Sequence, residues 1–292
     1  MMTLEQLRIF VAVAEREHLT QAAEALNLTP SAVSSAIRVV EERYGIALFH
    51  RTGRRIELTE TGHAFLPEAR ATLARAESTD LFLTEIGGLK RGTLTLAASQ
   101  TVGAYWLPPL LISFHAAYPA IDMRVGSGNT EQVAEAVLEG RVELGFVEGA
   151  IDHPALSQRT VARDRVVVVA PAGHPLLGKP VEPADLLAAH WVLREAGSGT
   201  RGALTAALAA RGVDEASLDI TLSLPSNEAV RSAVLAGGAL TAISELAVAD
   251  DLASGRLARI AFDLPERAFR LLRHKERYRS KASLALEALL PT

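Results

Sequence analysis

The stretch TQAAEALNLTPSAVSSAI, residues 20–37, constrains the fold of this chain more than any other. It contains two helix-forming runs, rich in alanine and serine, with a short corner between them. Asn27 tolerates left-handed backbone and can end the first helix. Thr29 can cap the second helix with its hydroxyl, and Pro30 suits the first helical position, where its missing N–H has no partner to lose. A corner this tight predicts a helix-turn-helix.

The two predicted helices have buried and exposed faces. Ala22 and Ala23 supply the small residues that the crossing of two close helices requires. On the second helix, spacings of three and four predict a buried stripe of Val33, Ile37, Val40 and Tyr44. The exposed face carries Ser31, Ser34, Ser35 and Arg38. Small polar side chains let a helix approach base edges and phosphates closely, so this face favours DNA binding, although an ordinary helical hairpin would carry the same pattern.

A cationic segment, HRTGRRIEL, follows the two helices. Arg51, Arg54 and Arg55 surround a turn at Gly53, and apolar residues flank it on both sides, which predicts a short β-hairpin, or wing. Guanidinium groups on such a hairpin are suited to the phosphate backbone. Residues 1–60 contain seven Lys and Arg against eight Asp and Glu, a formal charge of −1. Basic charge must therefore be sorted to one face, and we expect non-specific affinity to be modest.

Composition limits the class of protein. A length of 292 residues predicts two or three compact units, and a hydrophobic content of 49% is enough to bury several cores. The chain has no cysteine, which excludes disulfides and thiol chemistry and fits a reducing compartment. Its N-terminus lacks the pattern of a secretion signal, and no uncharged apolar run approaches the ~18 residues that span a bilayer. We expect a cytoplasmic protein without a membrane partner.

The remaining chain divides into a long helix and an α/β region. Residues 61–90 show one long helical pattern, the predicted linker and dimerisation helix between a DNA-binding domain at 1–60 and an effector-binding domain at 91–292. Two apolar seams along this helix fit a coiled coil nearly equally well. They are Leu66, Ala69, Leu73, Ala76 and Leu83, or Phe65, Ala69, Thr72, Ala76, Leu83 and Ile86. A narrow stripe is also typical of a helix that packs on its own domain.

Strand-like and helix-like runs alternate from residue 92 onward. This alternation predicts βαβ units, with mainly parallel sheets and helices on both faces. The expected strands are TLTLAA, DMRVGS, VELGFVE, RVVVVAP, HWVLRE, ITLSL, GALTAIS and FRLLRH. Sheets of this kind bind ligands at the carboxyl ends of their strands.

Hydroxyls and glycines cluster where predicted strands end and helices begin. The candidate effector-binding residues are Ser99, Gln100, Thr101, Glu148, Ser198, Gly199, Thr200 and Asn227. Free backbone N–H groups at helix starts suit a carboxylate, sulfate or phosphate, so we expect the effector to be a small anion. Glu148 and Glu195 are the acidic exceptions, because an amine-bearing effector would require one of them.

The chain resembles the LysR-type transcriptional regulators over nearly its whole length. The resemblance is carried by LEQLRIFVAVAE, LTQAAEALNLTPSAVSSAI, VEERYGIALFHRTGRRIELTETG, GTLTLAASQTVGAYWLPPLL, REAGSGTR and SNEAVRSAVLAGG. It implies a winged helix-turn-helix, a linker helix that forms an antiparallel dimer, often assembled into a tetramer, and a periplasmic-binding-protein-like domain of two α/β subdomains. The chain order then gives subdomain I as 92–161 with 268–292, and subdomain II as 162–267.

The implied partners are double-stranded DNA and a small-molecule effector. The predicted DNA-binding residues are Thr20, Gln21, Thr29, Pro30, Ser31, Ser34, Ser35, Arg38, Arg51, Arg54 and Arg55. In the family a serine commonly caps the first helix of the motif, where this chain has His18. We expect the effector to close the two subdomains, which shifts the DNA-binding heads and changes promoter bending or contact with RNA polymerase.

Two other classes of protein compete with this interpretation. A solute-binding transport protein would use the C-terminal two-thirds, but it would not need the first 60 residues. An enzyme with a DNA-binding head would need a catalytic constellation, yet the sequence contains no HExxH, GxSxG or GxGxxG, and its eight histidines are scattered singly. We therefore expect no catalysis, no metal site and no cofactor apart from the effector.

Overall fold

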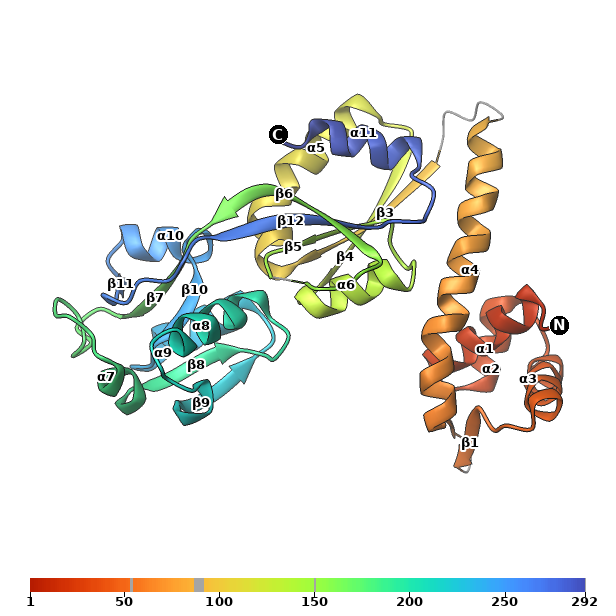
Figure 1. The fold of residues 1–292 in the computed structure, drawn as a ribbon, viewed down its shortest axis with the longest axis horizontal. Coiled ribbons are helices and arrows are strands. Elements are labelled where there is room, and N and C mark those ends of the chain that lie inside the picture. Colours follow the sequence, from red (N-terminus) through yellow and green to blue (C-terminus); the bar gives the residue numbers. More distant parts are fainter. Residues whose placement is uncertain (53–54, 87–91, 150, 292) are drawn as a thin grey trace. The chain divides into compact units, whose positions relative to one another are not determined.

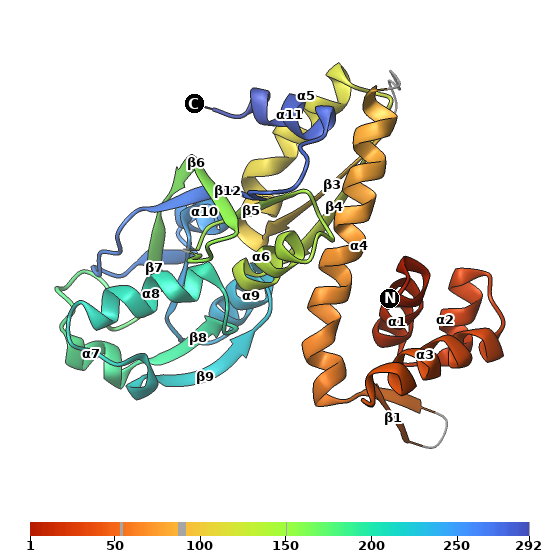
Figure 2. The same ribbon diagram turned by 45° about the vertical axis from the view of Figure 1, so that its right-hand side comes forward.

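The computed structural model describes residues 1–52, 55–86, 92–149 and 151–291, with only the backbone described for 51, 52, 55 and 84–86 (Figures 1 and 2). The chain separates into two compact units. The first comprises Met1–Leu89 with Leu138–Arg141, and the second comprises Lys90–Val137 with Val142–Thr292.

The first unit contains the predicted helix-turn-helix and wing. Its elements are α1 (Leu4–Arg16), α2 (Leu19–Leu26), α3 (Pro30–Tyr44), β1 (Phe49–Thr52), β2 (Arg55–Leu58) and α4 (Glu60–Ile86). Asn27 ends α2 in the left-handed conformation, with φ 55°. The Thr29 hydroxyl accepts a hydrogen bond from the Ala32 N–H at 3.2 Å, and Pro30 begins α3. Strands β1 and β2 pair antiparallel, so that the corner and the hairpin are both confirmed.

Helix α3 buries most of its predicted stripe. Ala22 and Ala23 are fully buried where the helices cross, and Val33, Ile37 and Val40 belong to the same core. The prediction was wrong for Tyr44, which is 52% exposed. Tyr44 lies in the last turn of α3, immediately before the helix ends at Gly45, and the stripe has left the core by that point.

The first half of α4 packs within its own unit. Ala69 is fully buried, and Phe65, Leu66 and Leu73 contact the core of the helix-turn-helix. Ala69 belongs to both predicted seams, Leu66 and Leu73 to the first, and Phe65 to the second. Side chains from each seam therefore contribute to the unit's own core. Farther along α4, Leu83 is 62% exposed.

The second unit contains two sheets, each with its own helices, which we call lobe 1 and lobe 2. The sheet of lobe 1 has the order β4 (Ile121–Gly128), β3 (Gly92–Ser99), β5 (Leu144–Val147), β12 (Arg267–His274) and β6 (Leu156–Asp164). Its helices are α5 (Leu107–Ala117), α6 (Thr130–Leu138) and α11 (Lys281–Leu289), with a π-helix, η1 (Val102–Trp106), before α5. Helices α5 and α11 lie together on one face of this sheet and α6 lies on the other (Figures 1 and 2).

Lobe 2 is built around β7 (Val166–Pro171), which pairs antiparallel with β10 (Thr241–Ser244) and β11 (Leu257–Arg259). A parallel pair, β8 (His190–Arg194) and β9 (Asp219–Leu224), adjoins β10 through the Trp191–Leu240 bridge. Its helices are α7 (Pro183–Ala188), α8 (Gly199–Ala209), α9 (Asn227–Ala236) and α10 (Glu245–Ala253), with a short η2 (Glu215–Ser217). Successive residues of β7 enter two different cores, one against α8 and one against α9 and α10, which explains its continuous run of valines.

The predicted mainly parallel sheets were wrong. Strand β3 is parallel to β4 and β5, but β12 is antiparallel to both of its neighbours, and both partners of β7 are antiparallel. The cause is the double crossover between lobes, which sends β12 back along lobe 1 in the opposite direction. Strand β6 continues to Asp164, three residues beyond the expected boundary at 161, and β12 begins at Arg267.

Candidate DNA-binding and effector sites

The exposed face of α3 carries the predicted polar side chains. Ser31, Ser35 and Arg38 are exposed, and Ser34 is half-buried. Arg38 and Glu42 form an exposed i,i+4 salt bridge at 3.6 Å, a type of pair that stabilises a helix by only about 0.3–0.5 kcal/mol. The Arg38 guanidinium can therefore exchange this partner for a phosphate or a base at little cost.

The start of α2 adds exposed polar groups next to this face. Thr20 and Gln21 are both exposed. The ring Nδ1 of His18 accepts a hydrogen bond from the Gln21 N–H at 3.4 Å, so histidine performs the capping role at the start of α2. The exposed Thr29 hydroxyl lies 3.0 Å from that of Ser31.

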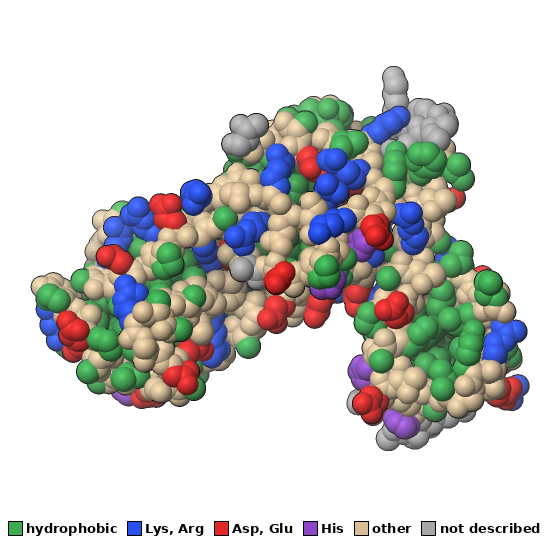
Figure 3. Space-filling model, in the orientation of Figure 1, with side chains coloured by type: hydrophobic (Ala, Val, Ile, Leu, Met, Phe, Trp, Pro, Cys, Tyr) green, Lys and Arg blue, Asp and Glu red, His purple; other side chains and the backbone are tan. Residues whose placement is uncertain are grey.

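For two of the predicted wing arginines, Arg51 and Arg55, the structure describes only the backbone. The hairpin register pairs Thr52 with Arg55 at the tip, and Arg51 lies one pair farther along, opposite Ile56. Arg54 lies outside the described residues. On the face of the first unit shown in Figure 3, Lys and Arg side chains are interspersed with acidic ones and with many hydrophobic ones, in line with the formal charge of −1 of residues 1–60.

Within the second unit, two buried arginines join the lobes through a hydrogen-bond network. Arg267, 8% exposed, donates to Thr200 Oγ1 at 3.0 Å and to Thr101 Oγ1 at 3.4 Å. Arg194, 1% exposed, donates to Asn227 Oδ1 at 2.8 Å, and the Asn227 amide donates to Thr101 Oγ1 at 3.1 Å. The network therefore holds together three predicted effector residues from two lobes, but it uses their side chains for contacts within the protein.

Four other buried side chains between the lobes have a polar atom without a hydrogen-bond partner among the described residues. These atoms are Ser99 Oγ, Thr130 Oγ1, Ser198 Oγ and Glu148 Oε2. Each such buried group costs about 1–3 kcal/mol unless a partner is supplied. Three of the four were predicted from the sequence as effector residues, and Thr130, at the start of α6, was not.

Glu148 is the most unusual of these groups. Its side chain follows β5 and is only 4% exposed. Burial raises the pKa of the Glu148 carboxyl, because the charged form loses its hydration, and the nearby charges of Arg267 and Arg194 oppose this rise.

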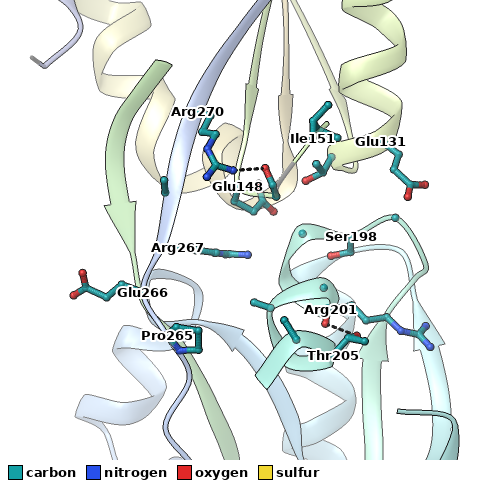
Figure 4. A pocket seen from close by; sticks show the side chains of 18 of the residues that line it. Glu131, Glu148, Ile151, Ser198, Arg201, Thr205, Pro265, Glu266, Arg267 and Arg270 are labelled. Atoms are coloured by element: carbon teal, nitrogen blue, oxygen red, sulfur yellow. Dashed lines mark hydrogen bonds between the residues drawn. The ribbon is translucent and has the colours of Figure 1, made fainter. Parts of the chain in front are cut away.

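A cavity of about 840 Å³ lies between the lobes and is lined by Glu148, Ser198, Gly199, Arg267 and Arg270 among others. In Figure 4, Arg267 and Ser198 extend toward the cavity from opposite sides, and Glu148 lies at the lobe 1 end. The lining does not include Ser99, Gln100, Thr101, Thr200 or Asn227.

Sequence reasoning missed the cavity arginines of β12. A β-bulge interrupts the pairing of β12 with β6 between Phe269 and Arg270, and its extra residue, Val161, lies on β6. Arg270 donates to the carbonyl oxygen of Gly149 at 3.2 Å and lines the cavity together with Arg267. Side chains alternate along a strand, so Arg267 and Arg270, three residues apart, are expected on opposite faces of the sheet. The sequence RAFRLLRH therefore did not predict that both would line the cavity.

Glycines allow the two lobes to approach closely beside the cavity. A Cβ atom on Gly199 would lie 2.8 Å from the Gly149 nitrogen and 2.8 Å from Thr130 Oγ1. Gly197 has φ +80°, a conformation that favours glycine. The segment GSG therefore provides a backbone contact between lobes in addition to any contact with a ligand.

A further contact between lobes is made by Tyr105 in η1. Its hydroxyl donates to Glu228 Oε1 of α9 at 2.6 Å. Burial is the main cause that raises the pKa of Tyr105 well above its ordinary value, and the acceptor Glu228 raises it further. π-Helical turns are frequent at functional sites, and this one directly follows the predicted residues Ser99 and Thr101.

The described residues contain no group of three or more His, Cys, Asp or Glu placed to hold a metal ion. None of the described helices is both long enough and apolar enough to cross a membrane.

Comparison with known proteins covers both units. Residues 4–63 match the bacterial regulatory helix-turn-helix protein, lysR family, and residues 87–291 match the LysR substrate binding domain. The uncharacterised HTH-type transcriptional regulator YeiE of Escherichia coli K12 is 33% identical over 282 residues, covering 96% of this chain and 94% of that protein.

Solved structures share the fold. Full-length CbnR in complex with its target DNA superposes with a TM-score of 0.66 at 22% identity, over 99% of each chain. The regulatory domain of Synechocystis PCC6803 CcmR in complex with 2-PG superposes with a TM-score of 0.61 at 27% identity, over 68% of this chain and 96% of that one. With a helix-turn-helix and an effector-binding domain both matched, this chain belongs to the LysR family of DNA-binding transcriptional regulators, which are not enzymes.

Proposed function

We propose that a small anion binds in the cavity between lobes 1 and 2 and controls how this regulator engages its operator. The observation that carries the proposal is that three cavity-lining residues, Thr130, Glu148 and Ser198, have a buried polar atom without a partner, and that Arg267 and Arg270 line the same cavity. Buried polar groups in native proteins are normally hydrogen-bonded, so atoms left without partners around a cavity are candidates for ligand contacts. The complex of the related CcmR domain with 2-PG supports a small-molecule ligand for this domain.

The predicted effector residues divide into two groups in this proposal. Glu148, Ser198 and Gly199 line the cavity and contact the effector directly. Thr101, Thr200 and Asn227 hold the arginine network in place, and Ser99 and Gln100 lie beside it at the end of β3. Ligand contacts in the first group therefore change the positions of residues in the second.

DNA recognition is assigned to α3, the start of α2 and the wing. The exposed face of α3, with Ser31, Ser34, Ser35 and Arg38, reads base edges in the major groove. Thr20, Gln21, Thr29 and Pro30 position the motif against the phosphate backbone. The wing residues Arg51, Arg54 and Arg55 add charge contacts with phosphates.

The active form in this proposal is a homodimer or homotetramer that works in the cytoplasm and contacts RNA polymerase. Two linked recognition helices bind adjacent major-groove turns and multiply weak single contacts. Exposed apolar side chains on α4, including Leu83, are available for the pairing of linker helices.

The anion proposal is tested by calorimetry of the full-length protein with anionic, cationic and neutral metabolites. We expect saturable binding confined to ligands that bear a carboxylate, phosphate or sulfate. Tight binding confined to cationic ligands would refute it. Mobility shift with DNA from upstream of the chain's own coding sequence tests the DNA assignment, because a protein that only binds solutes would shift no fragment selectively.

A further inference from the structure

The arginines of the network already have carboxylate partners. Arg267 pairs with Asp164 at 2.6 Å, and Arg194 pairs with its neighbour Glu195 at 2.8 Å through two nitrogens. Glu148 is the additional carboxylate: it forms no salt bridge with any described residue, and its Oε2 has no hydrogen-bond partner among them. An ionised Glu148 would thus leave one negative charge without a direct partner beside the cavity.

The other groups at this end of the cavity do not determine the chemistry of a ligand as strictly. The hydroxyls of Ser198 and Thr130 can donate or accept a hydrogen bond, whereas a carboxylate can only accept. A simple anion placed against Glu148 would be repelled by like charge. When Glu148 is ionised, the group on the ligand that contacts it must therefore carry a proton to donate.

An anion-binding group lies next to this carboxylate. Arg270 is half-buried and donates to the carbonyl oxygen of Gly149, the residue that follows Glu148. Among the described residues no carboxylate forms a salt bridge with Arg270, so its guanidinium is available to an anionic ligand. Arg270, which can bind an anion, and Glu148, which accepts a hydrogen bond, are thus adjacent along the cavity wall.

We propose that the effector is a 2-hydroxy or 2-amino acid, whose carboxylate binds Arg270 while the neighbouring hydroxyl or ammonium group donates to Glu148. The proposal rests on the proposed function, because it specifies the class of small anion that the cavity selects. Glu148 is the specificity-determining residue: it rejects anions that lack a donor next to the charged group.

Three dicarboxylates with the same four-carbon skeleton provide the test. Succinate has only hydrogen at C2, L-malate has a hydroxyl and L-aspartate has an ammonium group. Isothermal titration calorimetry with the full-length protein should show that L-malate or L-aspartate binds at least about tenfold more tightly than succinate, since a hydrogen bond to a charged group contributes about 1.5–3 kcal/mol. In Glu148→Gln this preference should fall to less than about threefold, because the amide no longer attracts the donor as a carboxylate does.

Glu135→Gln is the matched control, since Glu135 is an exposed carboxylate on α6 outside the cavity lining. It should keep the preference of the unaltered protein.

Equal affinity for the three ligands in the unaltered protein would overturn the inference while leaving the anion proposal intact. Tightest binding of succinate would also overturn it, because Glu148 would then act as a protonated donor. Failure of all three to bind at millimolar concentration would overturn the inference, whereas the anion proposal would fall only if no anion of the wider panel bound. The comparison in the unaltered protein is decisive even if Glu148→Gln does not fold.

Discussion

The carboxyl group of Glu148 illustrates, at the scale of a single residue, how a binding site can reduce the stability of the protein that carries it. The side chain is almost completely buried, and one of its oxygens has no partner among the described residues. Its pKa is raised above the ordinary value of 4.5, mainly by burial. Below that value the carboxyl is neutral in the folded and the unfolded state. As pH rises, the unfolded state ionises first, and stability is lost until the folded-state pKa has been passed.

Glu148→Gln should therefore raise the melting temperature of the second unit at neutral pH, with a gain that shrinks toward zero as pH falls to about 4.5. Differential scanning calorimetry of the ligand-free protein between pH 4.5 and pH 8 measures this difference. Glu135→Gln should show no comparable dependence on pH. A gain for Glu148→Gln that grows as the pH is lowered would show that the carboxyl is stabilised in its charged form.

Side chains of the wing and side chains of α3 should affect DNA binding in different ways. Arg54→Ala in the wing should weaken binding about equally for all DNA sequences and reduce the slope of log affinity against log salt by about one. Arg38→Ala or Ser34→Ala on α3 should instead change the preference between operator variants, by about 1–3 kcal/mol for a direct base contact. Fluorescence anisotropy with an operator and scrambled DNA at several salt concentrations checks both. Equal loss of selectivity in all three variants would contradict the division.

At the scale of elements, the start of α8 brings the lobes into backbone contact. Gly199→Ala would place a methyl group 2.8 Å from the Gly149 nitrogen, so the lobes could no longer approach as closely as they do. We expect effector affinity to fall at least about tenfold while the first unit still binds DNA, because loss of one hydrogen bond to a charged ligand costs about 1.5–3 kcal/mol. Calorimetry and mobility shift measure the two properties.

Gly202→Ala is the comparison within the same helix: Gly202 also lines the cavity, but a Cβ atom there meets nothing within 4 Å. It should leave lobe closure unaffected and stabilise α8 by about 0.4–1 kcal/mol, because alanine restricts the unfolded chain. Equal effector affinity in both glycine variants would show that close contact between the lobes is not required for binding.

Local sequence patterns predicted the helices and strands better than they predicted how the strands pair in sheets. The corner at Asn27 to Pro30, the wing and eight strands follow from residue periodicity and turn chemistry, and the structure confirms them. Strand β6, LSQRTVARD, was missed because it is an edge strand with mostly polar exposed positions. The direction of β12 and the β-bulge beside Arg270 depend on contacts with distant segments, which no local pattern reports.

At the scale of the whole molecule, an effector can act only through a difference in affinity between two arrangements of the protein. Contacts between lobes made by Arg267 with Thr200, and by Tyr105 with Glu228, provide groups whose positions depend on how the lobes are closed. A ligand that binds the closed lobes about a hundredfold more tightly would shift the equilibrium by about 2.7 kcal/mol. This is enough to convert a minor population into the dominant one.

Footprinting tests this control most directly. DNase I protection is measured on DNA from upstream of the chain's own coding sequence, with and without the tightest-binding ligand of the dicarboxylate series. We predict a discrete protected site that depends on Arg38, and a change in its extent or in its hypersensitive positions when the ligand is added. No protected site, or a footprint and an affinity for ligand that are the same in the free and DNA-bound protein, would contradict control of DNA binding by the cavity.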